Sequence, residues 1–233
     1  MNRYAYDSGG RNFMMGGSLA TAVRMLMAWN VIVFLLQLLM RGSLEGIFGL
    51  VPARVWGEGW IWQIVTYMFL HGGFLHIFFN MLALWMFGSE LEFLWGTRRF
   101  VQYYFLCGIG GAILTLLTSA HGTPYPTIGA SAAVFGILLA YGVTFPNRPI
   151  LLYFLFPIPA KYFVMIFGLL ELYSSLSGAR SGVAHWAHVG GLLTGLILLK
   201  GIPMLTKSRR RRKQQNFRVL EFHDRERDDD NWR

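Results

Sequence analysis

Several stretches of this chain are apolar over about the length that a lipid bilayer requires. A helix needs roughly 20 mostly apolar residues to cross the hydrocarbon region. Hydrophobic residues make up 54% of the chain and charged ones only 14%, against about a quarter charged in soluble proteins. We therefore expect an all-α, polytopic membrane protein that forms a six-transmembrane-helix bundle. The predicted spans are 21–40, 73–95, 99–119, 129–145, 157–177 and 183–200.

Polar tails flank this apolar region. We expect a flexible cytoplasmic N-terminal tail (1–20), a six-helix transmembrane domain (21–200) and a cytoplasmic basic and acidic C-terminal tail (201–233). Segments with so few apolar residues do not form a packed core. The basic run KSRRRRK, from Lys207 to Lys213, is expected to orient the chain. It could also contact anionic lipid head groups.

The distribution of basic residues predicts the orientation. Six spans place both termini on the same side. If that side is the cytoplasm, only Arg41, Arg54 and Arg180 face outward, and the other 18 of 21 Lys and Arg residues lie inside or near inner helix ends. Cytoplasmic loops of membrane proteins carry such an excess of positive charge. The net charge of +9 is therefore attributed to topology, and no nucleic-acid partner is expected.

Histidines gather at the outer ends of two predicted spans. An ionisable side chain at membrane depth is costly and suggests a function. The first cluster, HGGFLHIFFN, runs from His71 to Asn80, and its His76 lies four residues before Asn80. These two side chains therefore share one helix face. The aspartates all lie in the tails: Asp7, Asp224, Asp228, Asp229 and Asp230.

The second cluster, AHWAHVGGLLTG, precedes a stripe of small residues. His188 is followed on the same helix face by Gly191 and Gly195. This G-x-x-x-G pattern lets another helix approach closely. The span 129–145 carries a matching stripe, formed by Ala132, Gly136 and Ala140. We expect these two spans to pack together, which would bring Ser131 close to His188.

A serine beside a histidine suggests nucleophilic catalysis. A free hydroxyl is a weak nucleophile and needs an adjacent base, and a neutral imidazole can accept its proton. Ser131 begins a predicted helix, where backbone N–H groups lack partners and the dipole favours negative charge. With His76 and Asn80 as further donors, this end could stabilise an oxyanion. Because no aspartate lies in a span, we expect a Ser131–His188 dyad.

Other interpretations of these residues stay open. A serine such as Ser131, taken alone, usually serves close helix packing. A lone histidine at the end of a span usually lies at the membrane interface. Asn80, taken alone, would form an interhelical hydrogen bond. Glu171, in the fifth span, could orient His188 as a third member. The chemical alternative is a zinc or haem site, although the zinc motif H-E-x-x-H is absent. The zinc ligands would be His71, His76, His185 and His188, and two of these histidines could hold haem.

The connection between the first two spans is long and aromatic. It carries Trp56, Trp60 and Trp62, and tryptophan favours the membrane–water interface. We expect a folded piece that lies partly in the outer leaflet, with a plain loop held by aromatic anchors as the alternative. The single Cys107 is expected to have a packing role.

Three segments follow one another along the chain: HGGFLHIFFN, GASAAVFG and AHWAHVGGLLTG. Together they resemble the rhomboid intramembrane serine proteases, and the resemblance covers residues 30–200. Further segments look like the bacterial branch of that family. The resemblance implies Ser131 as nucleophile and His188 as base. It implies oxyanion donors at His76, Asn80 and the Ser131 N–H. It also matches positions with structural roles: His71, Gly129, Gly191 and Gly195.

The resemblance also implies cleavage of single-span membrane proteins near the outer end of their span, without a cofactor. We expect the protein in the bacterial cytoplasmic membrane with its active site opening outward. Two positions depart from the pattern. Ala132 replaces the usual glycine after the serine, and Gln63 follows Trp62 where relatives often carry an arginine that holds the outer loop. A non-catalytic rhomboid-like protein that binds membrane clients is the alternative.

Overall fold

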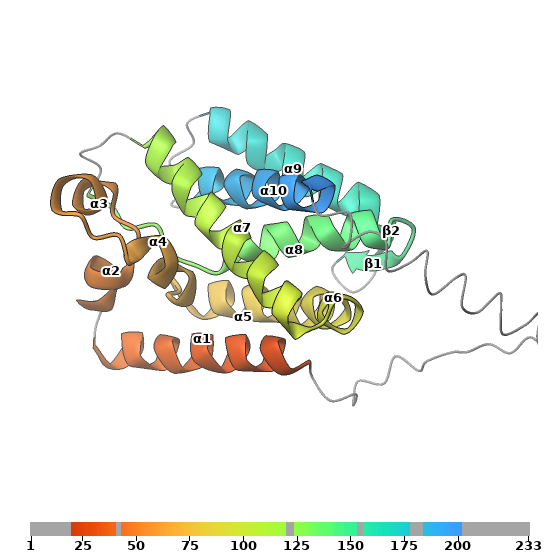
Figure 1. The fold of residues 1–233 in the computed structure, drawn as a ribbon, viewed down its shortest axis with the longest axis horizontal. Helices are drawn as coiled ribbons and strands as arrows, with labels where there is room; N and C mark the ends of the chain where they lie inside the picture. Colours follow the sequence, from red (N-terminus) through yellow and green to blue (C-terminus); the bar gives the residue numbers. More distant parts are fainter. Residues whose placement is uncertain (1–19, 41–42, 120–123, 153–155, 178–183, 202–233) are drawn as a thin grey trace, which may run out of the picture.

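The computed structural model describes residues 20–40, 43–119, 124–152, 156–177 and 184–201. The described residues form a helical bundle in which α7 crosses in front of α8 and α10 (Figure 1). This confirms the predicted all-α class. The long elements are α1 (Thr21–Leu39), α5 (Phe74–Ala83) continuing through the π-helical turn η2 (Leu84–Gly88) into α6 (Ser89–Trp95), α7 (Thr97–Thr118), α8 (Ser131–Thr144), α9 (Ala160–Leu176) and α10 (His185–Gly201).

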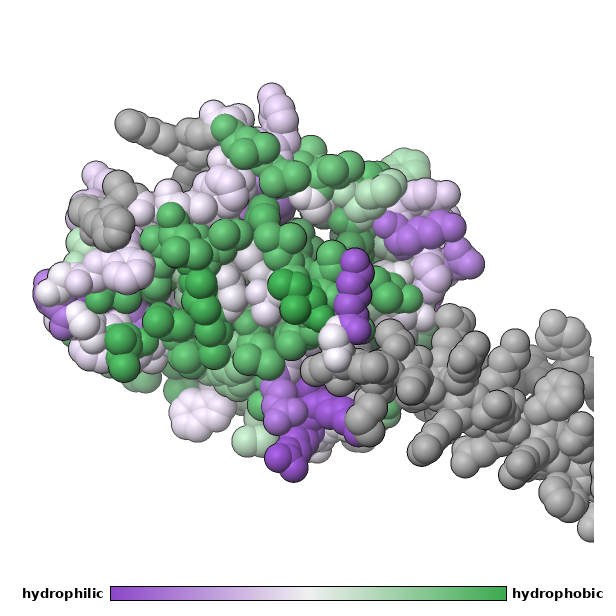
Figure 2. All heavy atoms as spheres, turned by 45° about the horizontal axis from the view of Figure 1, so that its top comes forward, coloured by the Kyte–Doolittle hydropathy of each residue, from purple (hydrophilic) through white to green (hydrophobic). Residues whose placement is uncertain are grey.

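Apolar helices of membrane-spanning length occur in the described part of the chain. Three of them are long and apolar enough to cross a bilayer: Thr21–Leu39, Phe74–Trp95 and Thr97–Thr118. Figure 2 shows a broad apolar face of the bundle, with hydrophilic residues mainly near its edges. Helix α8 has 14 residues and rises about 21 Å, less than the roughly 30 Å of hydrocarbon. The crossing of the membrane by all six helices stays a prediction.

A β-hairpin precedes α9, and the sequence analysis did not predict it. Strands β1 (Pro149–Leu152) and β2 (Phe156–Pro159) pair antiparallel, with Ile150 opposite Ile158. The predicted start of the fifth span, at residue 157, was therefore wrong, because the helix begins at Ala160. Proline lacks an N–H and is excluded from helix interiors, so the run FPIP pairs as an edge strand instead.

The connection between α1 and α5 is folded, as expected. It contains α2 (Ser43–Phe48), α3 (Pro52–Glu58), α4 (Gln63–Thr66) and the 3-10 turn η1 (Tyr67–Phe69). Figure 1 shows α2, α3 and α4 together at one end of the bundle. Their depth in a membrane stays a prediction.

Gln63 links three segments of this connection through its side-chain amide. Its side chain is fully buried. Its Oε1 accepts a hydrogen bond from Val51 N at 2.9 Å, and its Nε2 donates to the Ile47 carbonyl at 3.1 Å. Arg54 adds a bond to the Gly46 carbonyl at 2.5 Å and stacks on Trp60. The departure at this position therefore does not remove the loop network.

Glu92 fastens α1 to the corner between α6 and α7. Its buried carboxylate accepts hydrogen bonds of 2.9 Å each from the backbone N–H groups of Ala22 and Val23, and one of 2.7 Å from Thr97 Oγ1. The first N–H groups of a helix have no intrahelical acceptor. A carboxylate at that end satisfies two of them and complements the helix dipole.

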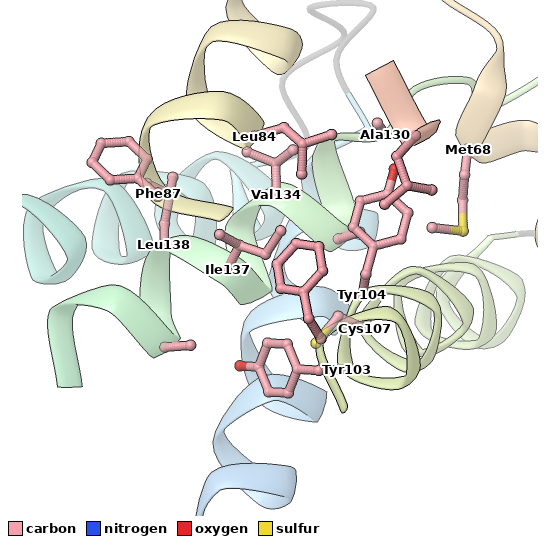
Figure 3. Packing of buried hydrophobic residues seen from close by; sticks show 14 of the residues in the cluster. Met68, Leu84, Phe87, Tyr103, Tyr104, Cys107, Ala130, Val134, Ile137 and Leu138 are labelled. Carbon is pink, nitrogen blue, oxygen red and sulfur yellow. The ribbon is translucent and has the colours of Figure 1, made fainter. Parts of the chain in front are cut away.

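The core lies between η2, α7 and α8. Figure 3 shows Tyr103 and Cys107 of α7 close to the apolar side chains of α8. Cys107 is fully buried, which agrees with the expected packing role. Residues 1–19 and 202–233 of the two tails, with Lys207 to Lys213, lie outside the described residues.

Candidate active site

The structure places Ser131 and His188 side by side. Ser131 is the first residue of α8, and His188 lies in the first turn of α10. Ser131 Oγ and His188 Nε2 are 2.7 Å apart, although 57 positions separate the residues. His188 is only 7% exposed. This is the hydrogen-bond distance at which an imidazole can accept a hydroxyl proton.

Close packing of α8 and α10 produces this distance. A Cβ at Gly191 would overlap the carbonyl oxygen of Ala132. A Cβ at Gly195 would lie 3.3 Å from the Gly136 Cα. The two small stripes therefore face each other, and the helix backbones approach as closely as glycine allows.

Gly129 shapes the turn that leads into α8. Its φ is +129°, a conformation that residues with a Cβ rarely adopt. Its N–H donates to the Tyr67 carbonyl at 2.9 Å. A Cβ at this position would lie 2.8 Å from His76 Nε2. The missing side chain thus leaves room for the His76 ring beside the loop that carries Ser131.

His76 presents a donor toward this loop. The Gly72 N–H donates to His76 Nδ1 at 3.2 Å. A neutral imidazole that accepts at Nδ1 carries its proton on Nε2, and Nε2 and Cε1 are the His76 ring atoms that would lie 2.8 Å from a Cβ at Gly129. Asn80 is buried, and its Nδ2 donates to the His76 carbonyl at 2.9 Å, which leaves the amide a second N–H to donate elsewhere.

His71 occupies a structural position next to His76. The two rings stack edge to face, with centroids 5.0 Å apart. The Gln37 side chain brackets the His71 backbone, accepting from its N–H at 2.9 Å and donating to its carbonyl at 3.2 Å. Burial lowers the pKa of the His71 imidazole to about 3, so this ring stays neutral and does not titrate near neutral pH.

His188 has two further contacts: one to Glu171, which the sequence offered only as an alternative, and one to Phe135, which no sequence motif singled out. Glu171 Oε2, from α9, lies 3.0 Å from His188 Nδ1 and 2.7 Å from His185 Nδ1. The Phe135 ring stacks on His188 with centroids 4.5 Å apart. Phe135 follows Ser131 by four residues, so helical spacing could have identified it. The depth of Glu171 could not be read from sequence.

The zinc or haem hypothesis named four histidines. In the part of the chain that the structure describes, the ligand atoms that gather within 4.8 Å of one another belong to Glu171, His185 and His188. His71 and His76 are not members of this group. The four-histidine site is therefore not assembled among the described residues.

Comparison with known proteins identifies the family. The model of the Rhomboid domain matches residues 58–202. The chain is similar to the rhomboid protease GluP of Bacillus subtilis, with 36% identity over 150 residues, 64% of this chain and 27% of the relative. It is also similar to the mitochondrial Rhomboid protein 1 of Saccharomyces cerevisiae, with 31% identity over 157 residues, 66% of this chain and 45% of that one.

A third relative is closer in size. The putative rhomboid protease YdcA of Bacillus subtilis is 33% identical over 139 residues, 59% of this chain and 65% of the relative. The chain thus spans less than two thirds of the length of each of these relatives. These relatives come from bacteria and from a eukaryote, so the assignment of this chain to the bacterial branch stays a prediction. Because the family model covers more than half of the chain, this multi-pass membrane protein belongs to the rhomboid family.

Proposed function

We propose that this protein is an intramembrane serine endopeptidase. It hydrolyses peptide bonds in or near the transmembrane segments of single-span membrane proteins. The observation that carries the proposal is the 2.7 Å distance between Ser131 Oγ and His188 Nε2. Family membership and the relatives named as rhomboid proteases add support.

The first half of the reaction forms an acyl-enzyme. Ser131 Oγ attacks the carbonyl carbon of the substrate peptide, and its proton moves to His188 Nε2. The carbonyl oxygen becomes an oxyanion that accepts hydrogen bonds from the His76 and Asn80 side chains and from the Ser131 N–H. When the C–N bond breaks, His188 gives the proton to the leaving amine, and the substrate acyl group stays on Ser131.

The second half releases the acyl group with water. His188 Nε2 takes a proton from a water molecule, whose oxygen attacks the ester carbon. The same donors hold the second oxyanion. The bond between the carbon and Ser131 Oγ then breaks, and His188 returns the proton to Ser131. The dyad is restored, and this chemistry needs no cofactor.

Location follows from the charge distribution. The excess of Lys and Arg in the tails and inner loops supports cytoplasmic termini and an active site that opens to the outer face. We place the protein in the bacterial cytoplasmic membrane. The basic run from Lys207 to Lys213 is proposed to contact anionic lipids on the inner side.

The test uses the purified full chain in detergent. The wild type is expected to cleave a single-span reporter and to react with a fluorophosphonate, which labels activated serines. Ser131→Ala and His188→Ala are each expected to abolish both signals without unfolding the protein. Ser177→Ala removes an exposed serine after α9 and should change neither. Cleavage by Ser131→Ala at the wild-type rate would contradict the proposal.

The same experiment separates the proposal from a non-catalytic function. A rhomboid-like protein that only binds membrane clients would hold the reporter without cutting it, and its serine would not react with the probe. Both Ser131 and His188 are present here at bonding distance, which favours the enzyme.

A further inference from the structure

We propose that Glu171 is a positioning residue that completes a Ser131–His188–Glu171 triad, with His185 holding the carboxylate in place. The inference rests on the proposed function. It adds to the expected dyad a carboxylate that α9 supplies from within a predicted span, and that the sequence offered only as an alternative.

The three groups form a continuous chain. Ser131 Oγ lies 2.7 Å from His188 Nε2, and Glu171 Oε2 lies 3.0 Å from His188 Nδ1. The His188 ring is therefore contacted at both nitrogens. The Glu171 and His188 side chains are 15% and 9% exposed, so water screens their interaction less than it screens a surface pair.

The protonation pattern favours this arrangement. To accept the Ser131 proton, Nε2 must be unprotonated, so the proton of the neutral His188 ring sits on Nδ1. An ionised carboxylate only accepts hydrogen bonds, and Glu171 Oε2 is the oxygen beside Nδ1. The carboxylate therefore selects the tautomer that the reaction needs, as an acid does in soluble serine proteases.

The contact is expected to strengthen during the reaction. Nδ1 lies within ion-pair distance of Oε2, yet the two atoms do not make a well-aligned hydrogen bond. The contact is therefore weak while His188 is neutral, and it becomes an ion pair when His188 takes the serine proton and becomes an imidazolium. An interaction that is stronger in the transition state than in the ground state accelerates the chemical step.

His185 fixes the position of the carboxylate. It precedes His188 by one turn of α10, and its Nδ1 lies 2.7 Å from the same Glu171 Oε2. Since the carboxylate accepts, His185 Nδ1 donates. Among the described residues of helix α9, only Ala160 and Ser175 are buried. The bond to His185 therefore ties Glu171 to the helix that carries the base.

The same three residues are also a zinc-like ligand set, and the distances distinguish the two possibilities. Ligand atoms around tetrahedral zinc, at 2.0–2.1 Å from the metal, lie about 3.3 Å from one another. Here the carboxylate oxygen is 2.7 Å and 3.0 Å from the two ring nitrogens. These distances therefore fit hydrogen bonds between the carboxylate and the two imidazole rings better than a bound zinc ion.

The test compares Glu171→Gln, Glu171→Asp, His185→Gln and Ser175→Ala with the wild type. The labelling rate with a small fluorophosphonate reports the reactivity of Ser131 without any need to bind a membrane substrate. Reporter cleavage, resolved into kcat and KM, reports the whole reaction. Ser175→Ala is the matched control, because it removes the bond from Ser175 Oγ to the Glu171 backbone carbonyl and leaves the carboxylate.

We expect Glu171→Gln to lower both the labelling rate and kcat by about 10²-fold, less than the roughly 10⁴-fold loss in soluble triads, because Nδ1 and Oε2 are not fully aligned. KM should change little. Glu171→Asp should recover part of the rate, His185→Gln should lose less than Glu171→Gln, and Ser175→Ala should match the wild type.

The pH profile gives a readout that a purely structural role would not change. Among the described residues, the titratable groups that face His188 are Glu171 from α9, His185 from α10 and His76 from α5, with Ser131 from α8. Removing the negative charge disfavours the imidazolium, so the acidic limb of the pH–labelling profile of Glu171→Gln should move to lower pH. A limb that stays in place contradicts the triad.

The outcomes separate the two proposals. If the wild type neither labels nor cleaves, the proposed function fails. If the wild type does both and Glu171→Gln labels and cleaves at the wild-type rates, the triad is wrong but the proposed protease function is kept. A loss of cleavage without a loss of labelling would assign Glu171 to substrate binding and overturn the inference. Stoichiometric zinc in the purified wild type, absent from His185→Gln, would also overturn it.

Discussion

Gly191 of α10 lies directly against the carbonyl oxygen of Ala132 in α8, so that no side chain fits between them. Ala132 follows Ser131, and Gly191 is one turn beyond His188. The contact therefore sets the separation of the two helices at the point where the hydroxyl and the imidazole meet. Because protein interiors are close-packed, a methyl group added here must move one helix.

We predict that Gly191→Ala lowers the labelling and cleavage rates by at least about tenfold and destabilises the protein by about 1–3 kcal/mol, as overpacking does. Thermal unfolding in detergent and fluorophosphonate labelling measure the two effects. Gly201→Ala is the matched control on the same helix, because a Cβ there meets nothing within 4 Å. Wild-type rates in Gly191→Ala would contradict the packing argument.

Gly129→Ala is expected to reduce activity more than stability. The added Cβ would need a backbone conformation near φ +129° and would lie 2.8 Å from His76 Nε2, at a cost of about 1–3 kcal/mol of backbone strain. The turn or the His76 ring must then shift. Gly57→Ala, where a Cβ has open space, provides the comparison. The expected signature is a fall in kcat with a folded protein.

Removing the proposed oxyanion donors should slow chemistry and spare binding. His76→Ala and Asn80→Ala are each expected to lower kcat by about 10²–10³-fold, with little change in KM. Steady-state cleavage of the single-span reporter measures both constants. If both variants keep the wild-type kcat, the donors lie elsewhere.

Glu92→Ala is expected to lower stability without touching the site. The variant leaves two N–H groups at the start of α1 and the Thr97 hydroxyl without their acceptor, which should cost about 2–4 kcal/mol in total. Glu92→Gln keeps acceptor oxygen and should lose less. Thermal unfolding gives the ranking of the three proteins. An unchanged midpoint in Glu92→Ala would show that water replaces the carboxylate.

Gln63→Ala should loosen the connection between α1 and α5. Its side chain bridges Val51 N and the Ile47 carbonyl while fully buried, and an orphaned buried polar group costs about 1–3 kcal/mol. Proteolytic nicking between residues 43 and 69 is expected to be faster in the variant. Glu58→Ala, at an exposed position of α3, should be cut at the wild-type rate.

Much of the fold could be predicted because each membrane helix corresponds to one continuous apolar segment of the sequence. The apolar runs that predicted spans 21–40 and 99–119 became α1 and α7 within one or two residues. The hairpin β1–β2 was missed because its apolar residues look like the start of a span. Only the prolines at 149, 157 and 159, which exclude a helix, indicated otherwise.

The sequence by itself determined which residues carry reactive groups and which helix faces are small enough to meet, because helical spacing assigns side chains to faces. That spacing places Gly191 and Gly195 on the face of His188, and Ser131 and His188 were singled out by their chemistry and by the family resemblance. Only the tertiary structure decided that Glu171 lies 3.0 Å from the far nitrogen of His188. Its depth and direction depend on how α9 packs against α10, and that packing is a long-range property that no local pattern records.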